Sequence, residues 1–215
     1  MEIPLWKKAI SYLYPLVLKT YQSQYSGRLE IGLQDGKIVL DTANVNYSFG
    51  SLHKVFDKAI KNIIFDTQKT YKTLILGFGV GSIAQVLQKK QAKFDITGIE
   101  IDDKIIELGE KYFKTKNIPN CHIIAENAID FLKKDSGSYD LIFVDLFIDD
   151  KVPPTFKEVS FLKKIKSKIS ENGHLMMNDM FVKNERKEIL KRTLEQCSIY
   201  MYLEENTIFH FHNKH

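Results

Sequence analysis

The stretch TLILGFGVGS at residues 73–82, with GIEID at residues 98–102, decides the fold that this sequence predicts. A short apolar run leads into three glycines at alternate positions, and a helical pattern follows them. A second apolar run, FDITGIE, then ends in the acid Glu100. Strand, glycine turn, helix, strand and acid in this order are typical of half of a nucleoside-binding α/β unit.

The chemistry of this pattern explains its residue types. Gly77, Gly79 and Gly81 allow the backbone to turn sharply, and they let a ligand approach where a Cβ would otherwise lie. Glu100 follows Gly77 by 23 residues, close to the roughly 20-residue offset of a carboxylate that accepts hydrogen bonds from both ribose hydroxyls. The alternative is an ordinary tight turn followed by a solvated acid at the end of a strand.

Composition sets the outer limits on function. The 215 residues are 44% hydrophobic and 27% charged, which suits one globular domain with a small appendage. A formal net charge of +4 is too small to indicate nucleic-acid binding. Cys121 and Cys197 lack metal-site spacing, no apolar run reaches the ~18 residues of a membrane span, and the amino terminus lacks a signal-peptide pattern. We therefore expect a cytoplasmic protein without a metal, nucleic-acid or membrane partner.

The residues before the glycine turn predict an appendage at 1–48, ahead of a main domain at 49–215. Apolar residues at three- and four-residue spacing predict a helix over 4–21, with a kink or break at Pro15. Two short strands at 27–33 and 37–42 flank an Asp-Gly pair, which is a strong hairpin signal.

The main domain alternates helices and strands, which predicts an α/β, Rossmann-like fold. The sheet is expected to be mostly parallel and seven-stranded, with an antiparallel last strand. The run YDLIFVD is almost continuously apolar, as expected for a strand buried on both faces. Strands are predicted at 73–77, 95–100, 122–125, 139–145, 174–178, 198–204 and 206–212, and helices at about 51–66, 81–91, 103–116, 127–134, 155–170 and 184–196.

This order resembles the class I S-adenosylmethionine-dependent methyltransferases, and within them the spermidine synthase branch, over residues 25–178. Four segments carry the resemblance: LEIGLQDGKIVLDT, IEIDDKIIELGEKYF, AENAIDFL, and YDLIFVDLFIDDKVPP with the later ENGHLMMN. They are similar to that family's amino-terminal hairpin, its Glu-x-Asp strand end, its adenine-contact motif, and its catalytic-Asp loop with the strand that follows.

The sequence also departs from that family. Val80 stands where the family has an Asp that faces the aminopropyl amine, and Val39 replaces a Gln in the hairpin. Asn127 replaces the Asp of the adenine motif, and Asp145 is not followed by the family's x-x-Asp-Pro. A buried valine cannot replace a carboxylate opposite an ammonium group. The resemblance therefore implies the fold and the nucleoside site, and it supports aminopropyl transfer poorly.

The resemblance implies a site for S-adenosylmethionine or its decarboxylated form. Asn127, with the Ala128 amide, is expected to read the adenine edge, although Asn127 could instead cap a helix and Glu126 is a competing polar residue. The full set of expected cofactor-binding residues is Gly77, Phe78, Gly79, Gly81, Glu100, Ile101, Asn127 and Ala128.

Asp145 is the expected catalytic residue. It ends a buried strand, at the edge where open α/β sheets bind ligands, and it could orient the acceptor or take its proton. The alternative is a structural acid or a helix cap. Tyr47 and Asp149 are expected to contact the acceptor, against the alternatives of a packed aromatic residue and a solvated loop acid.

Four functions remain open from the sequence. Methyl transfer to an unidentified small acceptor comes first, and polyamine aminopropyl transfer second. A magnesium-dependent O-methyltransferase, with oxygen ligands from Asp145 and from Asn178-Asp179, is third. A non-catalytic nucleoside-binding domain is fourth. The resemblance also implies a homodimer formed through the amino-terminal region.

Overall fold

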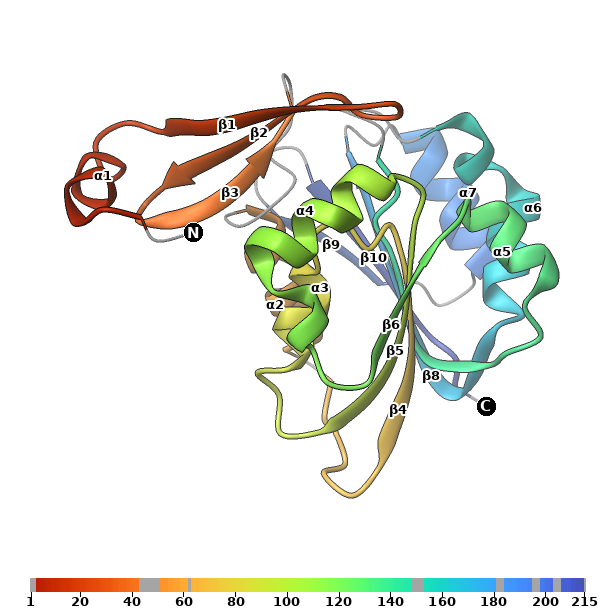
Figure 1. The fold of residues 1–215 in the computed structure, drawn as a ribbon. Helices are drawn as coiled ribbons and strands as arrows, with labels where there is room; N and C mark the ends of the chain where they lie inside the picture. Colours follow the sequence, from red (N-terminus) through yellow and green to blue (C-terminus); the bar gives the residue numbers. More distant parts are fainter. Residues whose placement is uncertain are drawn as a thin grey trace.

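A small amino-terminal sheet lies at one end of a larger sheet, and helices cover both faces of the larger sheet (Figure 1). Tyr47 and Asp149, and the predicted boundary between residues 48 and 49, fall outside the described part of the chain. The structure, a computed structural model, describes residues 3–42, 51–61, 63–147, 153–180, 184–194, 198–202 and 206–214.

The amino-terminal region differs from its prediction. The helix expected over 4–21 is wrong beyond its first turns, because α1 spans only Leu5–Ile10 and β1 spans Leu16–Ser23. Pro15 lies between them, and its fixed φ and missing N–H disfavour a continuous helix. Downstream of Pro15, pairing with the next strand and packing of Tyr21 outweigh the helical spacing of the apolar residues.

The predicted hairpin is confirmed. Strand β2 (Gly27–Gln34) pairs antiparallel with β3 (Lys37–Asp41) across a two-residue turn. Asp35 and Gly36 have φ values of 50° and 71°. Two successive residues at positive φ match the right-handed twist of paired strands, which explains why Asp-Gly favours this turn.

The seven-stranded sheet has the order β6-β5-β4-β7-β8-β10-β9. All its described pairings are parallel except those of β10, which runs antiparallel to both β8 and β9. This confirms the predicted Rossmann-like α/β class. The strands are β4 (Thr70–Leu76), β5 (Lys93–Glu100), β6 (Cys121–Ala125), β7 (Tyr139–Val144), β8 (Ile169–Met180), β9 (Ser198–Tyr202) and β10 (Asn206–His212).

Helices α2 and α3 cover one face of this sheet, and α5, α6 and α7 cover the other (Figure 1). The helix predicted over 155–170 ends earlier, because Ile169 already pairs with Tyr139 and begins β8. No helix in the described ranges is long and apolar enough to cross a membrane. The helices are α2 (Ser51–Ile60), α3 (Ser82–Leu87), α4 (Asp103–Phe113), α5 (Ala128–Lys134), α6 (Val159–Lys166) and α7 (Asn184–Leu194), with short 3-10 turns η1 (Thr115–Asn117) and η2 (Pro154–Lys157).

An apolar cluster joins the small sheet to the main domain. One face of β2 and β3 packs on α4 and on the glycine turn after β4. Burial of side chains on both partners stabilises this contact in proportion to the apolar area removed from water. The buried members of the cluster are Leu29, Ile31, Leu40, Val80, Ile105, Leu108, Tyr112 and Phe113.

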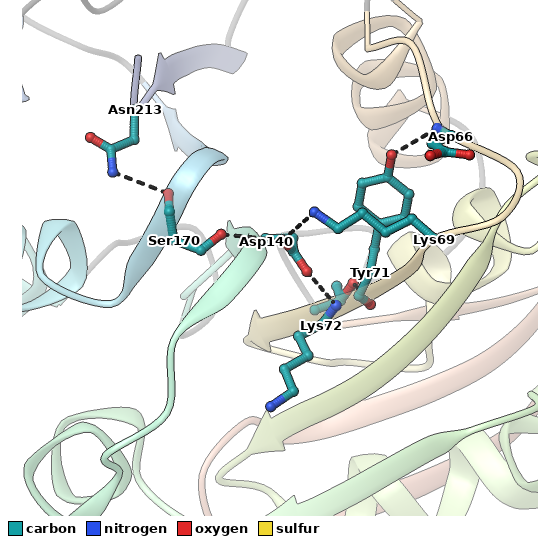
Figure 2. Close-up of polar contacts among 8 residues, drawn as sticks. Asp66, Lys69, Tyr71, Lys72, Asp140, Ser170 and Asn213 are labelled. Atoms are coloured by element: carbon teal, nitrogen blue, oxygen red, sulfur yellow. Dashed lines mark hydrogen bonds and ion pairs between the residues drawn. The ribbon is translucent and has the colours of Figure 1, made fainter. Parts of the chain in front are cut away.

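A polar network lies at the amino-terminal ends of β7 and β8 in the main sheet (Figure 2). The Asp140 carboxylate accepts hydrogen bonds from the Lys72 backbone N–H at 2.9 Å and the Lys69 ammonium at 2.7 Å. It also accepts one from the Ser170 hydroxyl at 3.2 Å. Asn213 donates to the Ser170 carbonyl at 3.0 Å. The network joins three strands and the last segment, so its role is structural.

Candidate cofactor and acceptor site

The three glycines of the turn after β4 all have positive φ, at 82°, 56° and 84°. A Cβ on Gly77 would lie 2.1 Å from the Asp145 carbonyl oxygen, so this glycine permits close packing against the end of the neighbouring strand β7. A Cβ on Gly79 would meet nothing within 4 Å, whereas one on Gly81 would touch Thr115 at 3.0 Å. Gly79 is therefore the glycine of this turn that borders free space.

Phe78 faces the protein interior. Its side chain is 3% exposed, and a Cβ on Gly98 of β5 would lie 2.2 Å from the Phe78 ring. The Phe78 backbone N–H donates to the Ile99 carbonyl at 2.9 Å. The ring therefore fixes the turn against β5. A ligand on the Gly79 side would meet the backbone of this segment, and the ring would be turned away from it.

Glu100 bridges the glycine turn and the segment after β5. One carboxylate oxygen accepts the Gly79 N–H at 2.8 Å, and the other accepts the Asp102 N–H at 3.1 Å. Burial raises the pKa of Glu100, while the two backbone donors act in the opposite direction. Ile101, next in the chain, is half-buried. The carboxylate retains lone pairs beyond these two contacts, as a ligand for hydroxyl donors requires.

Asn127 caps α5, so the helix-cap alternative from the sequence is realised. Its side-chain oxygen accepts the Ile129 N–H at 2.8 Å. The cap uses the oxygen and leaves the side-chain NH₂ as a donor, so capping is compatible with reading a base edge. Glu126 instead forms an ion pair with Lys134 at the surface. Ala128 is 4% exposed in the first turn of α5.

Asp145 directly follows β7. Its backbone N–H donates to the Leu76 carbonyl at 2.8 Å, and its carboxylate accepts the Asn178 side-chain NH₂ at 2.9 Å. Burial raises the pKa of Asp145 to about 7, the negative charge of Glu100 adds to the effect, and the Asn178 hydrogen bond opposes it. A carboxyl group with a pKa near neutrality can both accept and release a proton, which suits a general base.

Asn178 and Asp179, at the end of β8, complete this edge. From the sequence, both residues are expected only as possible magnesium ligands, because they lie at the end of the fifth predicted strand. Asn178 is 3% exposed, and its side-chain oxygen has no hydrogen-bond partner. Asp179 is 1% exposed, with a carboxylate oxygen 3.9 Å from the Lys157 ammonium. That ammonium competes with any cation for the carboxylate.

Among the residues that the structure describes, no group of three or more His, Cys, Asp or Glu side chains is arranged to hold a metal ion. The magnesium ligands expected from the sequence, Asp145 with Asn178 and Asp179, include an amide and stay a prediction.

Val80 lies inside the apolar cluster between the small sheet and α4. It is 1% exposed and packs among side chains of β2, β3 and α4. Val39 on β3 is 3% exposed. Both departures from the spermidine synthase pattern therefore place hydrocarbon in buried positions. A carboxylate at either position would need a partner to offset its loss of hydration.

The predicted residues come from neighbouring strand ends. The glycine turn follows β4, Glu100 ends β5, and Asn127 and Asp145 lie after β6 and β7. These four strands are parallel neighbours. Their carboxyl ends therefore meet at one edge of the sheet, where open α/β sheets bind ligands. That Gly79, Glu100 and Asn127 bind a nucleoside together stays a prediction. The fold and this edge define a Rossmann-like domain of the class I methyltransferase type.

Comparison with known proteins narrows the class to a family. Residues 53–209, well over half of the chain, match the family described as the spermine/spermidine synthase domain. The chain therefore belongs to the spermine/spermidine synthase family.

The known proteins that are similar to this chain include the following three. The probable polyamine aminopropyl transferase of Bifidobacterium longum is 28% identical over 131 residues, which cover 57% of this chain and 29% of the relative. A probable spermidine synthase from Corynebacterium glutamicum superposes with a TM-score of 0.75 at 16% identity, covering 91% of this chain and 80% of that one. Human methyltransferase-like protein 13, solved in complex with SAH, superposes with a TM-score of 0.63 at 21% identity, covering 76% and 82%.

These likenesses carry different weight. The chain spans less than a third of the length of the curated relative named above. The two superpositions are below 25% identity and show the fold alone. The named proteins include both an aminopropyl transferase and a methyltransferase-like protein, so the likenesses agree on a transferase fold and differ on the group transferred.

Proposed function

We propose that this chain is an S-adenosylmethionine-dependent transferase that moves a methyl group to a small acceptor. The observation that carries the preference for methyl is the burial of Val80, at 1% exposure, within an apolar cluster. This residue takes the place of the acid that faces the aminopropyl amine in spermidine synthases. An ammonium group bound beside the glycine turn would find no carboxylate at residue 80, and an unpaired ammonium removed from water costs several kcal/mol.

The two donors differ in this respect. Decarboxylated S-adenosylmethionine ends in an ammonium group without a carboxylate of its own. S-adenosylmethionine carries both, so part of the charge is balanced within the ligand. A turn that lacks an acid at residue 80 therefore favours the intact amino acid over the decarboxylated form.

The protein's part in the reaction is placement. Bound S-adenosylmethionine supplies a methyl carbon that its sulfonium already activates, so no covalent intermediate with the protein is required. Glu100 is proposed to accept the ribose hydroxyls, and the backbone around Gly79 to border the donor. Asp145 is proposed to orient the acceptor and take its proton as the new bond forms, because its pKa of about 7 lies close to neutral pH.

Aminopropyl transfer is the second candidate. It is supported by the family to which residues 53–209 belong and by the named Bifidobacterium relative. The half-buried Asp145 carboxylate would serve an amine acceptor in this reaction as well. The two candidates therefore differ in the donor that binds.

Calorimetric titration with S-adenosylmethionine, its decarboxylated form and methylthioadenosine distinguishes these functions. Methyl transfer predicts micromolar binding of S-adenosylmethionine, with the decarboxylated form binding no more tightly. Tighter binding of the decarboxylated form would move aminopropyl transfer to first place. Absence of binding by all three would leave a domain without this cofactor. Glu100→Ala is the control variant. If it no longer binds the ligand that the unsubstituted protein binds, the titration reports binding at the proposed site.

We further propose that the protein forms a homodimer through its amino-terminal region. Support comes from large apolar side chains that are exposed on and after α1, and from the absence of any buried residue in α1. Apolar patches of this kind often mark interfaces. Light scattering should give twice the 25.0 kDa chain mass, and Leu13→Glu should return the protein to 25.0 kDa. The exposed residues are Leu5, Trp6, Ile10, Tyr12, Leu13, Tyr14 and Val17.

A further inference from the structure

Asp102 lies at a junction between the small sheet and the proposed cofactor site. It is 2% exposed and caps α4, where one carboxylate oxygen accepts the backbone N–H groups of Lys104 and Ile105 at 3.0 and 3.4 Å. The other oxygen accepts hydrogen bonds from the hydroxyls of Ser23 and Ser26, the latter at 2.7 Å. A helix cap requires only the first of these two sets of contacts.

The two serines belong to the turn between β1 and β2. Ser23 is the last residue of β1, and Ser26 immediately precedes β2. The Ser23 hydroxyl oxygen also accepts the backbone N–H groups of Tyr25 and Ser26, at 3.0 and 3.1 Å. The turn is thus ordered internally, and it presents two hydroxyl donors to one buried carboxylate oxygen. Hydrogen bonds to a charged acceptor are stronger than those between neutral groups.

The backbone N–H of Asp102 connects this junction to Glu100. Its N–H donates to one oxygen of Glu100 at 3.1 Å, while the second oxygen of Glu100 accepts the Gly79 N–H at 2.8 Å. A continuous series of hydrogen bonds therefore runs from the serine turn through Asp102 and Glu100 to the glycine turn. A carboxylate that must meet two ribose hydroxyls depends on its orientation, because a misplacement of about 1 Å is enough to lose activity.

We propose that Ser23, Ser26 and Asp102 are positioning residues for the ligand. They dock the β1–β2 turn onto the segment after β5 and so fix Glu100 in the orientation that accepts the ribose hydroxyls. This role rests on the proposed function in one respect, that the ligand is a ribonucleoside. The small amino-terminal sheet would then be part of the cofactor site, although Gly79, Glu100 and Asn127 all belong to the main domain.

The test compares two ligands in matched variants. The probes are methylthioadenosine and its 2′,3′-dideoxy analogue, which lacks the two hydroxyls. The variants are Ser26→Ala and the double variant Ser23→Ala with Ser26→Ala, and the measured quantities are the two Kd values and the free energy of unfolding in urea. Ser11→Ala is the matched control. Ser11 is 2% exposed in the same small unit and hydrogen-bonds to Lys8 and Gly36, away from Asp102.

We expect the double variant to weaken methylthioadenosine binding about tenfold, as the loss of charge-assisted hydrogen bonds implies. The dideoxy analogue should weaken by less than about twofold, because it does not use the Glu100 contact. Ser11→Ala should leave both Kd values unchanged. Ser26→Thr, which keeps the hydroxyl, should bind methylthioadenosine like the unsubstituted protein.

Three results would overturn the inference. Equal weakening for both ligands would mean that the serines act on the fold as a whole. Unchanged Kd values in a folded double variant would mean that docking of the β1–β2 turn does not affect the orientation of Glu100. Failure of the unsubstituted protein to bind methylthioadenosine would instead remove the proposed function, and the positioning role with it. If the double variant unfolds, Ser26→Ala alone, which leaves the Ser23 bond intact, decides between the first two.

Discussion

Replacing Asp145 by Asn should stabilise the protein above neutral pH while it abolishes the proposed base. The pKa of the Asp145 carboxyl is raised from 3.8 to about 7, chiefly by burial. An acid whose folded pKa lies above its unfolded pKa prefers the protonated form in the folded state. Its stability contribution is complete below about pH 3.8, and it is lost as pH rises through 7.

The magnitude follows from the same two values. The interval from 3.8 to about 7 corresponds to about 4 kcal/mol at 1.36 kcal/mol per pH unit. Because part of the Asp145 side chain is exposed, solvent reduces this figure, and we expect about 2–4 kcal/mol. Asn has nearly the same shape, cannot ionise, and keeps an oxygen for the Asn178 donor. Asp145→Asn should therefore gain that amount at pH 8 and about nothing at pH 4.

Urea unfolding followed by circular dichroism at pH 4, 6 and 8 measures the difference. In a chain of this size, 1 kcal/mol shifts the Tm by about 2–4 °C, so the gain at pH 8 should also be visible by thermal denaturation. The rate of transfer should fall by about 10²–10⁴-fold, the usual contribution of a general base.

A difference in stability that does not vary with pH would refute the reasoning, since burial of an ionised group would not be its source. Asp140→Asn is the control carboxylate. It accepts hydrogen bonds from Lys69, Lys72 and Ser170 at the opposite edge (Figure 2), so its replacement should destabilise the protein by breaking the ion pair.

Three further predictions follow from packing and charge. Gly77→Ala should destabilise by more than about 3 kcal/mol in urea unfolding, because its Cβ would lie 2.1 Å from a backbone oxygen, whereas Gly79→Ala, with free space, should cost about 1 kcal/mol. Val80→Asp should lower the Tm and shift the calorimetric preference toward the decarboxylated donor; an unchanged preference would count against the Val80 argument. Burial lowers the pKa of His174 to about 3, and His212 and His210 add to the effect. The stability contribution of the neutral ring should therefore be complete above about pH 6.5 and decline as pH falls toward 3. His174→Gln should flatten that decline, which Tm values from pH 7 to 4 would measure.

Local sequence signals predicted the elements whose geometry is set by neighbouring residues. The Asp35-Gly36 turn required two residues at positive φ, and few residue pairs other than this type adopt them readily. The glycine turn was predictable for a similar reason, because positive φ at three alternate positions favours glycine over other residues. The cap of α5 at Asn127 was visible for the same reason, since the side chain bonds to its own helix.

Predictions failed where distant contacts outweighed local pattern. Apolar residues after Pro15 have helical spacing, but pairing with β2 and contact with α4 make that segment a strand. Ile169 was predicted as the end of a helix, and it begins β8 because Tyr139 pairs with it across the sheet. In both cases the competing conformations are close in intrinsic preference, so tertiary packing decides between them.

The sequence by itself determined the α/β class, the order of the elements in the main domain and the residues at its strand ends, because periodicity and turn chemistry are local properties of the chain. Only the tertiary structure decided what those residues touch. It gave Asp145 its Asn178 partner and its raised pKa, buried Val80 under the small sheet, and joined Ser23 and Ser26 to Asp102. Such contacts join segments tens of residues apart, and they depend on how whole elements pack, which no local pattern encodes.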